Sequence, residues 1–350
     1  MKLRFRRLGL GVLATAASLL VSIPLAASPS VASAHVPDTF SGCLAGSGVP
    51  TRYRHGGDTE SVSRVTKQRV QAELRDQLAA VRAASAVPAA ATARSATTPA
   101  PSRLTVVHPL VVMHVIHGDH ASDRNVTRSQ ARNLYYTLRD GFAGRQDPTM
   151  GPTGVVFKLR KITVTRNDQW FHAGPMSAAD KQMRRKLHVG GPNVLNVYLT
   201  SPRDSGQSLL GYARFPWLAS SSPALDGITI NVISMNGGRA TGYNRGDTIV
   251  HETGHWMGLF HTFEGGCDAP GDYVADTAAE GEPSFQCNTK RDTCPTPDPP
   301  GSTNLDPAPP AVPDPVRNFM DYSYDSCMIQ FTKGQRERMI AAYLHYRAPR

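Results

Sequence analysis

The chain has 350 residues and a formal net charge of +10 at pH 7, a balance that at first favours a protein that binds nucleic acid or another polyanion. The charge is unevenly placed, because residues 1–34 carry +4, residues 35–102 carry +3 and residues 103–350 carry only +3. A basic binding patch in the folded part of the chain is therefore not indicated, and we expect no nucleic-acid partner.

The first 34 residues have the pattern of a secretory signal peptide. Residues 2–7 are basic, residues 8–27 are mostly apolar and small, and Ala32-Ser33-Ala34 offers an Ala-x-Ala cleavage site. A membrane anchor is the alternative, but polar residues, glycines and a proline interrupt the apolar run. No later stretch approaches the roughly 20 apolar residues that a transmembrane helix needs. We expect a secreted, extracellular protein with no membrane partner.

Residues 35–102 are predicted to form a propeptide. Between residues 59 and 84, valines and leucines recur at helical spacing with charges between them, which predicts an amphipathic helix; a merely solvated or disordered segment is the alternative. Residues 85–102 form a linker of Ala, Pro, Ser and Thr with too few large apolar residues to pack, and proteases reach such segments easily. The catalytic domain is therefore expected to span residues 103–350.

The catalytic part alternates between strand and helix patterns, which predicts an α+β fold in one domain. We expect a twisted mixed sheet packed on helices above a cleft, and an irregular lower part below it. The predicted strands are 110–116, 155–164, 193–199 and 227–233, and the predicted helices are 128–142, one beginning near 247, and 333–346.

A run of polar residues on the helix that begins near residue 247 predicts a metal site. His251, Glu252, His255, Gly258 and His261 form an unbroken H-E-x-x-H-x-x-G-x-x-H motif. Residues four apart lie on one face of a helix, so His251 and His255 can aim at one ion. Glu252 lies about 100° around the helix, which places its carboxylate beside a metal-bound water as a general base.

The third histidine requires the helix to stop early. Gly258 allows a left-handed turn at low cost, and the chain can then double back to deliver His261. Three imidazoles leave the fourth zinc position open for water, as peptide-bond hydrolysis requires. The alternative is a buried amphipathic helix with incidental polar residues, which explains the apolar positions but not this register.

The motif and several further segments resemble a known family. The extended motif resembles the metzincin signature, whose second half is a methionine turn, here within Asn318-Phe319-Met320-Asp321-Tyr322. From about residue 103 onward the chain is similar to the pappalysin family of secreted metalloendopeptidases. The segments that carry this resemblance are HTFEGGC (261–267), VADT (274–277), RDTCP (291–295), LGYARFP (210–216), DGI (226–228) and YNRG (243–246). Ala278 and the Pro-rich insert after Cys294 depart from the family pattern.

The resemblance implies a metzincin-type zincin fold with a long zinc-binding helix and a disulfide-tied lower subdomain. Met320 is expected to underlie the zinc site without touching the metal. Tyr322 is expected to reach toward the metal and donate a hydrogen bond to the oxyanion that forms on the scissile carbonyl. A packing role for Tyr322 is the alternative.

Cys267, Cys287, Cys294 and Cys327 are an even number in an oxidising compartment, which favours two disulfides. Three pairings are open on spacing alone, and a Cys-rich structural zinc site lacks its usual paired spacing here. The family resemblance implies the pairs Cys267–Cys294 and Cys287–Cys327.

Two further ligand sets are expected. The resemblance implies a calcium ion after the zinc helix, for which Asp272, Asp276 and Thr277 can supply oxygens; ordinary loop capping is the alternative. Cys43 is the cysteine outside the catalytic part, and we expect its thiolate to occupy the open zinc position in the proenzyme. A dispensable or intermolecularly paired thiol is the alternative.

The substrate is expected to add to an edge strand. By resemblance, the strand 209–213 borders the cleft, so that Leu210, Gly211, Tyr212 and Ala213 offer unpaired backbone groups to an extended peptide. A plain core strand is the alternative.

Specificity is expected to come from the segment after the methionine turn, which in metzincins helps to build the pocket for the side chain immediately C-terminal to the cut. Asp325 on that pocket's floor would favour Lys or Arg, because a buried carboxylate is costly unless paired. Its alternatives are exposure to solvent and the capping of a turn.

These expectations combine into one function. The chain is predicted to be a monomeric zinc endopeptidase of proteins and peptides, made as a latent proenzyme and secreted. A catalytically silent zincin-like binding protein is the main alternative, and a disulfide-rich structural module is another. Glu252 favours the enzyme, because silent relatives of such scaffolds typically lose the general base.

Overall fold

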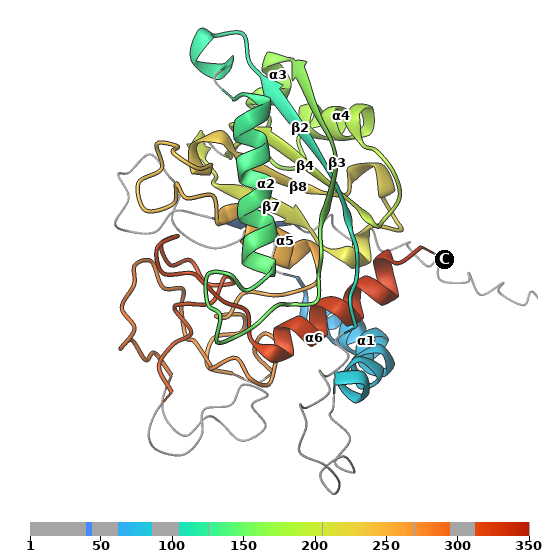
Figure 1. Ribbon diagram of the computed structural model, residues 1–350, viewed down its shortest axis with the longest axis vertical. Coiled ribbons are helices and arrows are strands. Elements are labelled where there is room, and N and C mark those ends of the chain that lie inside the picture. Colours follow the sequence, from blue (N-terminus) through green and yellow to red (C-terminus); the bar gives the residue numbers. More distant parts are fainter. Residues whose placement is uncertain are drawn as a thin grey trace, which may run out of the picture. The chain divides into compact units, whose positions relative to one another are not determined.

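A six-stranded mixed sheet forms the centre of the fold (Figure 1). The computed structural model describes residues 40–43, 62–85, 105–124, 126–204, 206–268, 270–294 and 312–349. For residues 40–43 only the backbone is described. The expected signal peptide, its cleavage site, most of the linker and the junction at residue 103 lie outside these residues.

The sheet has the strand order β1-β7-β8-β4-β2-β3. Strands β3, β2, β4 and β8 are parallel neighbours, whereas β7 runs antiparallel to both β8 and β1. Among the strands that follow residue 100, β7 is therefore the edge strand, and β1 pairs with its outer edge. The bounds are β1 Phe40–Cys43, β2 Leu110–His117, β3 Lys158–Arg166, β4 Val194–Thr200, β7 Gly211–Arg214 and β8 Ile228–Asn231, with a separate two-stranded ribbon of β5 Arg203–Asp204 and β6 Gln207–Ser208.

Helices cover both faces of the sheet. Their bounds are α1 Arg64–Ser85, α2 Arg128–Phe142, α3 Asp168–Phe171, α4 Ala178–Leu187, α5 Thr248–Trp256 and α6 Lys333–Ala342, which continues as a π-helix, Tyr343–Arg347. Four 3₁₀ turns lie at Ala121–Arg124, Pro216–Leu218, Pro223–Leu225 and Val232–Ser234.

Alternation along the strands separates the two faces. In β2, Val111, Met113 and Val115 belong to the main core, which α2 and α5 cover. The next residue, Ile116, faces the other side and packs with Trp170 of α3 in a second cluster. Successive side chains of a strand point to opposite faces, so one strand serves both layers.

The predicted elements agree with most of this architecture. The helix 128–142 has the expected bounds because a capping box of Thr127 and Gln130 fixes its start. The strand expected at 155–164 is displaced to 158–166, and Val155 makes only an isolated bridge to Val107. Helix α4 was not predicted, because its buried side chains are Met183 and the ion-paired residues Asp180 and Arg184 rather than an apolar stripe.

Two disulfides tie the irregular lower part together. They join Cys267 to Cys294, with Cα atoms 5.4 Å apart, and Cys287 to Cys327, with Cα atoms 5.6 Å apart. The pairing implied by the family resemblance is therefore confirmed. The links close loops of 27 and 40 residues, each worth roughly 3–4 kcal/mol in a chain-entropy account.

Helix α1, from the expected propeptide, packs on α6 (Figure 1). Its helical stripe of Val70, Leu74, Leu78 and Val81 is buried. Polar contacts flank the stripe: Arg338 Nη1 donates to Gln71 Oε1 at 2.8 Å, and the Tyr346 hydroxyl bonds the Glu73 carboxylate. Within the described part of the chain, no helix combines the length and the apolar character needed to cross a membrane.

Candidate active site

Three histidine rings converge on one point at α5. The Nε2 atom of His255 lies 3.0 Å from that of His251 and 3.1 Å from that of His261. Ligand nitrogens at 2.0–2.1 Å from a tetrahedral zinc ion lie roughly 3.4 Å apart, so the observed spacing is close to that of a zinc site. All three side chains are buried, and their nitrogens lie close enough together to bind one metal ion.

Backbone carbonyls bind the Nδ1 nitrogens of His251 and His255, the two histidines on α5. His251 Nδ1 lies 2.6 Å from the Phe319 oxygen, and His255 Nδ1 lies 2.8 Å from the Leu259 oxygen. A carbonyl can only accept, so each Nδ1 carries the proton and each Nε2 keeps its lone pair for a metal. Burial lowers the pKa of His251 to about 4 and the pKa of His255 and His261 well below the usual range, which keeps the imidazoles neutral.

A sharp turn after α5 brings the third histidine into place. Helix α5 has only nine residues, shorter than the long helix expected from the family resemblance. Gly258 has φ of 98°, a left-handed value that favours glycine, and a Cβ there would lie 2.9 Å from Ala342 Cβ. The early end of the helix is what allows His261 to return to His255.

Glu252 lies fully buried between the helix and the edge strand. A Cβ at Gly211 would lie 2.8 Å from Glu252 Oε1, so the carboxylate packs directly against the backbone of β7. The glutamate is therefore held between the histidine cluster and the strand to which an extended peptide can add.

Met320 supports the helix from below. A Cβ at Gly254 would lie 2.4 Å from Met320 Sδ, so the sulfur packs against the helix backbone between His251 and His255. The side chain is fully buried, and Met320 N–H donates to Asn318 Oδ1 at 2.9 Å. The methionine turn thus forms a floor beneath the ligands.

Tyr322 packs against two of the three ligand rings. Its ring centroid lies 5.0 Å from that of His261 and 5.8 Å from that of His251. Phe263 adds an edge-on contact at 4.9 Å. The phenol therefore lies at the metal site itself, with 4 % of the residue exposed.

Comparison with known proteins identifies this arrangement. The peptidase family described as pregnancy-associated plasma protein-A matches residues 179–343. An extracellular metalloprotease of Neurospora crassa is 38% identical over 242 residues, which are 68% of this chain and 75% of that protein. The chain belongs to the pappalysin family. It is an extracellular metalloendopeptidase with a metzincin fold, and its substrates are proteins or peptides.

Further relatives include extracellular metalloprotease 1 of Coccidioides posadasii, which is 44% identical over 200 residues covering 56% of this chain and 65% of its own. Among solved structures, mature mirolysin of Tannerella forsythia, in complex with a cleaved peptide, is 28% identical with a TM-score of 0.53 and covers 67% of this chain and 90% of its own. A promirolysin variant is 26% identical with a TM-score of 0.56, and it covers 80% of this chain and 90% of its own.

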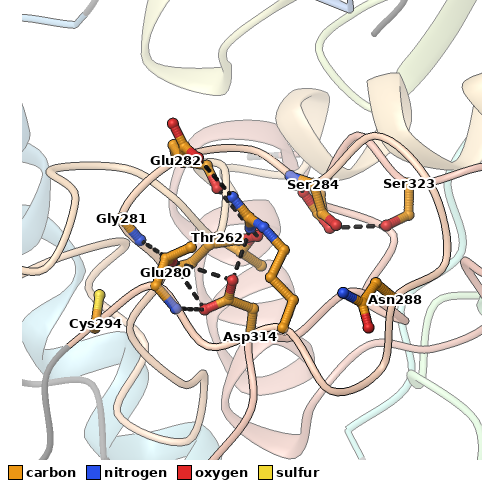
Figure 2. Close-up of polar contacts among 12 residues, drawn as sticks. Thr262, Glu280, Gly281, Glu282, Ser284, Asn288, Cys294, Asp314 and Ser323 are labelled. Carbon is orange, nitrogen blue, oxygen red and sulfur yellow. Dashed lines mark hydrogen bonds and ion pairs between the residues drawn. The ribbon is translucent and has the colours of Figure 1, made fainter. Parts of the chain in front are cut away.

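A buried polar network connects the third histidine's loop to the lower part (Figure 2). Thr262, next to His261, donates from its hydroxyl to Glu280 Oε2 at 2.6 Å. Arg291 Nη1 lies 3.0 Å from Glu280 Oε1 and 2.7 Å from Asp314 Oδ2, so it forms ion pairs with both carboxylates. Burial, together with the charge of Asp321, raises the pKa of Glu280 well above its usual range, and the charge of Arg291 opposes this rise only in part.

The methionine turn is tied to the same region through Asp321. Its Oδ1 accepts from Ser284 N–H at 2.9 Å and from Tyr322 N–H at 2.7 Å, and its Oδ2 accepts from the Ser323 hydroxyl at 2.9 Å. Burial raises the pKa of Asp321 to about 7. Sequence reasoning missed this network, because its members come from separate loops with no shared spacing.

The four residues expected to bind substrate lie on or beside β7. The side chain of Tyr212 is buried, and its hydroxyl donates to Asp180 Oδ1 at 2.7 Å. Asp180 in turn accepts from Arg184 Nε at 2.9 Å. The side chain of Tyr212 therefore points toward α4, which leaves only its backbone for the substrate contact expected of it. Leu210 and Ala213 are also buried, and Gly211 faces Glu252.

The expected calcium ligands separate into two groups. Asp272 and Thr277 are buried, and burial raises the pKa of Asp272 to about 8, although a hydrogen bond with the Thr277 side chain opposes this rise. Asp276 is exposed and caps α6 instead, accepting from the Thr332 hydroxyl at 2.7 Å and from Gly334 N–H at 2.8 Å. Both oxygens of Asp276 thus accept hydrogen bonds at the start of α6, which favours capping, the alternative to the calcium role expected for this residue.

Asp325 caps a turn, which is one of the alternatives to the pocket role expected for it. It is 3 % exposed, and its Oδ2 accepts from the backbone N–H groups of Arg245 at 2.7 Å and Gly246 at 3.1 Å. The carboxylate caps the turn before α5 and lines a cavity of about 710 Å³ on the side of α2. It is not among the residues that line the cavity of about 20 Å³ beside His251.

Proposed function

We propose that this extracellular metalloendopeptidase holds one zinc ion on His251, His255 and His261 and hydrolyses peptide bonds with Glu252 as the general base. The convergence of the three Nε2 atoms beside a buried glutamate carries the proposal. When bound, zinc lowers the pKa of a water molecule to about 7 and polarises the scissile carbonyl. Glu252 takes the proton of the attacking water and delivers it to the leaving amine.

The substrate backbone is held by β7. The edge of this strand takes an extended segment in antiparallel pairing, as the register of Cys43 with Gly211 and Phe40 with Arg214 illustrates. A peptide in the same place carries its scissile bond past Glu252, because Gly211 contacts that carboxylate. Leu210, Gly211, Tyr212 and Ala213 therefore act through backbone groups and through the fixed position of the strand.

Metal content and metal removal test this function directly. The purified mature protein is expected to contain one zinc ion and to cleave casein, and a zinc chelator is expected to abolish cleavage until zinc is restored. Calcium is assigned to Asp272 and Thr277 with backbone carbonyls, so Asp272→Asn should lose bound calcium and keep zinc. Chelator-resistant cleavage of casein would contradict the zinc proposal, and unchanged calcium in Asp272→Asn would contradict the calcium site.

Tyr322 stabilises the oxyanion of the reaction in this proposal. Its contact with the rings of His251 and His261 supports a hydroxyl close to the scissile carbonyl. Tyr322→Phe is expected to lower kcat about 10²-fold, the usual cost of removing one oxyanion donor, while KM and zinc content change little. Steady-state kinetics on one peptide check this, and an unchanged kcat would leave Tyr322 with a packing role only.

The precursor is latent because the propeptide covers the cleft in this proposal. Residues 1–34 are the signal peptide, 35–102 the propeptide and 103–350 the monomeric catalytic domain. The pairing of β1 with β7 supports occupation of the substrate strand's place, and α1 docks on α6. In this register the Cys43 backbone lies opposite Gly211, which itself packs against Glu252. This placement supports the proposal that the Cys43 thiolate occupies the open zinc position.

Cys43→Ser is expected to weaken this latency. A serine hydroxyl is a much poorer zinc ligand than a thiolate, so the precursor should cleave a peptide faster than the wild-type precursor or process itself sooner. The measurement is activity per precursor molecule before any processing, followed by N-terminal sequencing of the mature protein. Ser41→Ala, on the same strand, is the matched control. Equal latency in all three precursors would remove the switch from the proposal, and sedimentation of the mature protein would check the monomer.

A further inference from the structure

The third proposed zinc ligand is placed differently from the other two. His251 and His255 lie on α5, where helical spacing fixes both side chains on one face. His261 comes after the last residue of that helix, Trp256, in a segment without helix or strand. The position of His261 therefore depends on the contacts that hold this segment.

Thr262, the next residue along the chain, is bound on two sides. Its N–H donates to the Met320 carbonyl at 3.2 Å, and its hydroxyl donates to Glu280 Oε2 at 2.6 Å. The side chains of Thr262 and Glu280 are both fully buried. The residue beside the third histidine is thus attached to the methionine turn through its backbone and to Glu280 through its side chain.

Glu280 lies beside Thr262 and Asp314 in the buried network (Figure 2). Arg291 Nη1 lies 3.0 Å from Glu280 Oε1 and 2.7 Å from Asp314 Oδ2. The same nitrogen donates to the Glu282 carbonyl at 2.9 Å. A buried carboxylate is costly without such partners. Because one oxygen of Glu280 faces Arg291 and the other faces Thr262, this side chain connects the lower part of the protein to the segment of the third histidine.

The far end of that segment is tied to the same network. Cys267 is bonded to Cys294. Thr293, the residue before Cys294, donates from its hydroxyl to Asp314 Oδ1 at 3.0 Å, and Asp314 is the second carboxylate that pairs with Arg291. The segment that follows the third histidine is therefore attached at both ends to one buried network.

We propose that Thr262 and Glu280 are positioning residues for the third zinc ligand, and that their hydrogen bond fixes the backbone from which His261 reaches the metal. The inference rests on the proposed zinc-dependent function of the same site. Metal ligands must be held in place by the residues around them, since a ligand that moves freely has to be ordered when the ion binds. Without this hydrogen bond His261 gains freedom while the helix pair stays fixed, so the metal is held less tightly.

Thr262→Val tests the inference, because it removes the hydroxyl and keeps a branched side chain. The measurement is competition for zinc between the zinc-loaded mature protein and a chelator of known affinity. The variant is expected to bind zinc about tenfold or more less tightly than the wild type, as when other outer partners of metal ligands are removed.

Two variants separate this hydrogen bond from general stability. Thr153→Val is the matched control, because Thr153 is buried outside the zinc site and its hydroxyl donates to the Phe142 carbonyl at 2.8 Å and accepts from Val155 N–H at 3.1 Å. Both valine variants should lower the denaturant midpoint of the zinc-loaded protein, since each leaves a buried polar group unpaired, but only Thr262→Val should weaken zinc binding. Thr262→Ser keeps the hydroxyl and should bind zinc within about threefold of the wild type.

Variants of Glu280 test the other side of the bond. Glu280→Gln can keep both contacts, because its amide oxygen can accept from Arg291 and its NH₂ group can donate to the Thr262 hydroxyl, so zinc binding should stay within about threefold. Glu280→Ala removes both contacts and should weaken zinc binding about tenfold or more. If Thr262→Val does not fold, Thr262→Ala takes its place, with Thr153→Ala as its control.

The outcomes separate this inference from the function on which it rests. Zinc binding in Thr262→Val within about threefold of the wild type would overturn the inference, and so would an equal weakening in Thr153→Val. Weakened binding in Thr262→Ser would assign the effect to side-chain packing instead of the hydroxyl and would also overturn it. If the wild-type mature protein binds no zinc and cleaves no casein, the proposed function fails instead.

Discussion

Glu252→Ala should retain one zinc ion per molecule and lose about 10³- to 10⁴-fold in kcat, the upper part of the range for removal of a general base. The ligands are unaffected, because His251 and His255 keep their carbonyl contacts and Gly258 keeps the turn that places His261. The reaction loses the group that takes the proton from water and returns it to the leaving amine. The change creates space beside Gly211 but removes no zinc ligand.

Metal analysis and peptide kinetics on the same preparation check this expectation. Glu282→Ala is the matched control, because that glutamate is 76% exposed in an ion pair with Arg291 and lies outside the zinc site, and exposed pairs contribute little. Near-wild-type turnover in Glu252→Ala would exclude it as the base. Loss of zinc together with activity would instead make Glu252 part of the metal site.

The zinc site could be predicted from the sequence because its geometry is local. His251, Glu252 and His255 lie on one helix, where spacing fixes which side chains share a face. Gly258 predicts the turn that brings His261 back toward the other two histidines. The strands of the central sheet could be predicted for a similar reason, since continuous apolar runs are typical of buried parallel strands. The family resemblance supplied the cysteine pairing, which spacing alone left open.

The features that could not be predicted depend on contacts between distant segments. Asp276 was expected to bind calcium and Asp325 to line the substrate pocket, whereas the structure shows that Asp276 caps α6 and Asp325 caps the turn before α5. The same kind of contact hides the hydroxyl of Tyr212 against Asp180. A carboxylate or a phenol in a loop carries no local signal of its partner, so only the folded chain distinguishes a ligand from a cap.

Strand β1 also could not be predicted from the sequence. Phe40–Cys43 is four residues long with two small residues, too short for an alternation to be recognised. Its position follows from the edge of β7, which has backbone groups to satisfy, rather than from its own composition. An expectation of a Cys43 switch could therefore be formed without any expectation of the strand that supports it.

The second large effect concerns the stability of the zinc helix. Arg347→Ala is expected to lower the free energy of unfolding of the mature protein by about 3–5 kcal/mol, as does the breaking of other buried ion pairs. Arg347 is fully buried near the C-terminus, and its Nη1 and Nη2 bond the two oxygens of Asp226 at 2.7 and 3.1 Å. Its Nε also donates to the carbonyl of Trp256, the last residue of α5, at 2.9 Å.

The large effect follows from what the truncation leaves behind. Asp226 would remain buried with Trp256 Nε1, at 3.1 Å, as its one side-chain hydrogen-bond donor among the described residues, and the guanidinium that stacks 3.6 Å above the Trp256 ring would be gone. Thermal and denaturant unfolding at fixed zinc concentration measure the change, because bound metal adds its own stabilisation. Lys333→Ala, which removes an exposed partner of Glu337, is the control and should cost under about 1 kcal/mol.

Double replacement distinguishes the charge from the packing. If the cost of Arg347→Ala comes from an unpaired Asp226, then Arg347→Met combined with Asp226→Leu should recover much of the lost stability, since both charges are removed and apolar volume is kept. Arg347→Ala with stability within about 1 kcal/mol of wild type would show that water reaches Asp226. Because Arg347 bonds the end of α5, a destabilised variant should also lose zinc sooner on dilution into chelator, which links the C-terminal segment to retention of the catalytic metal.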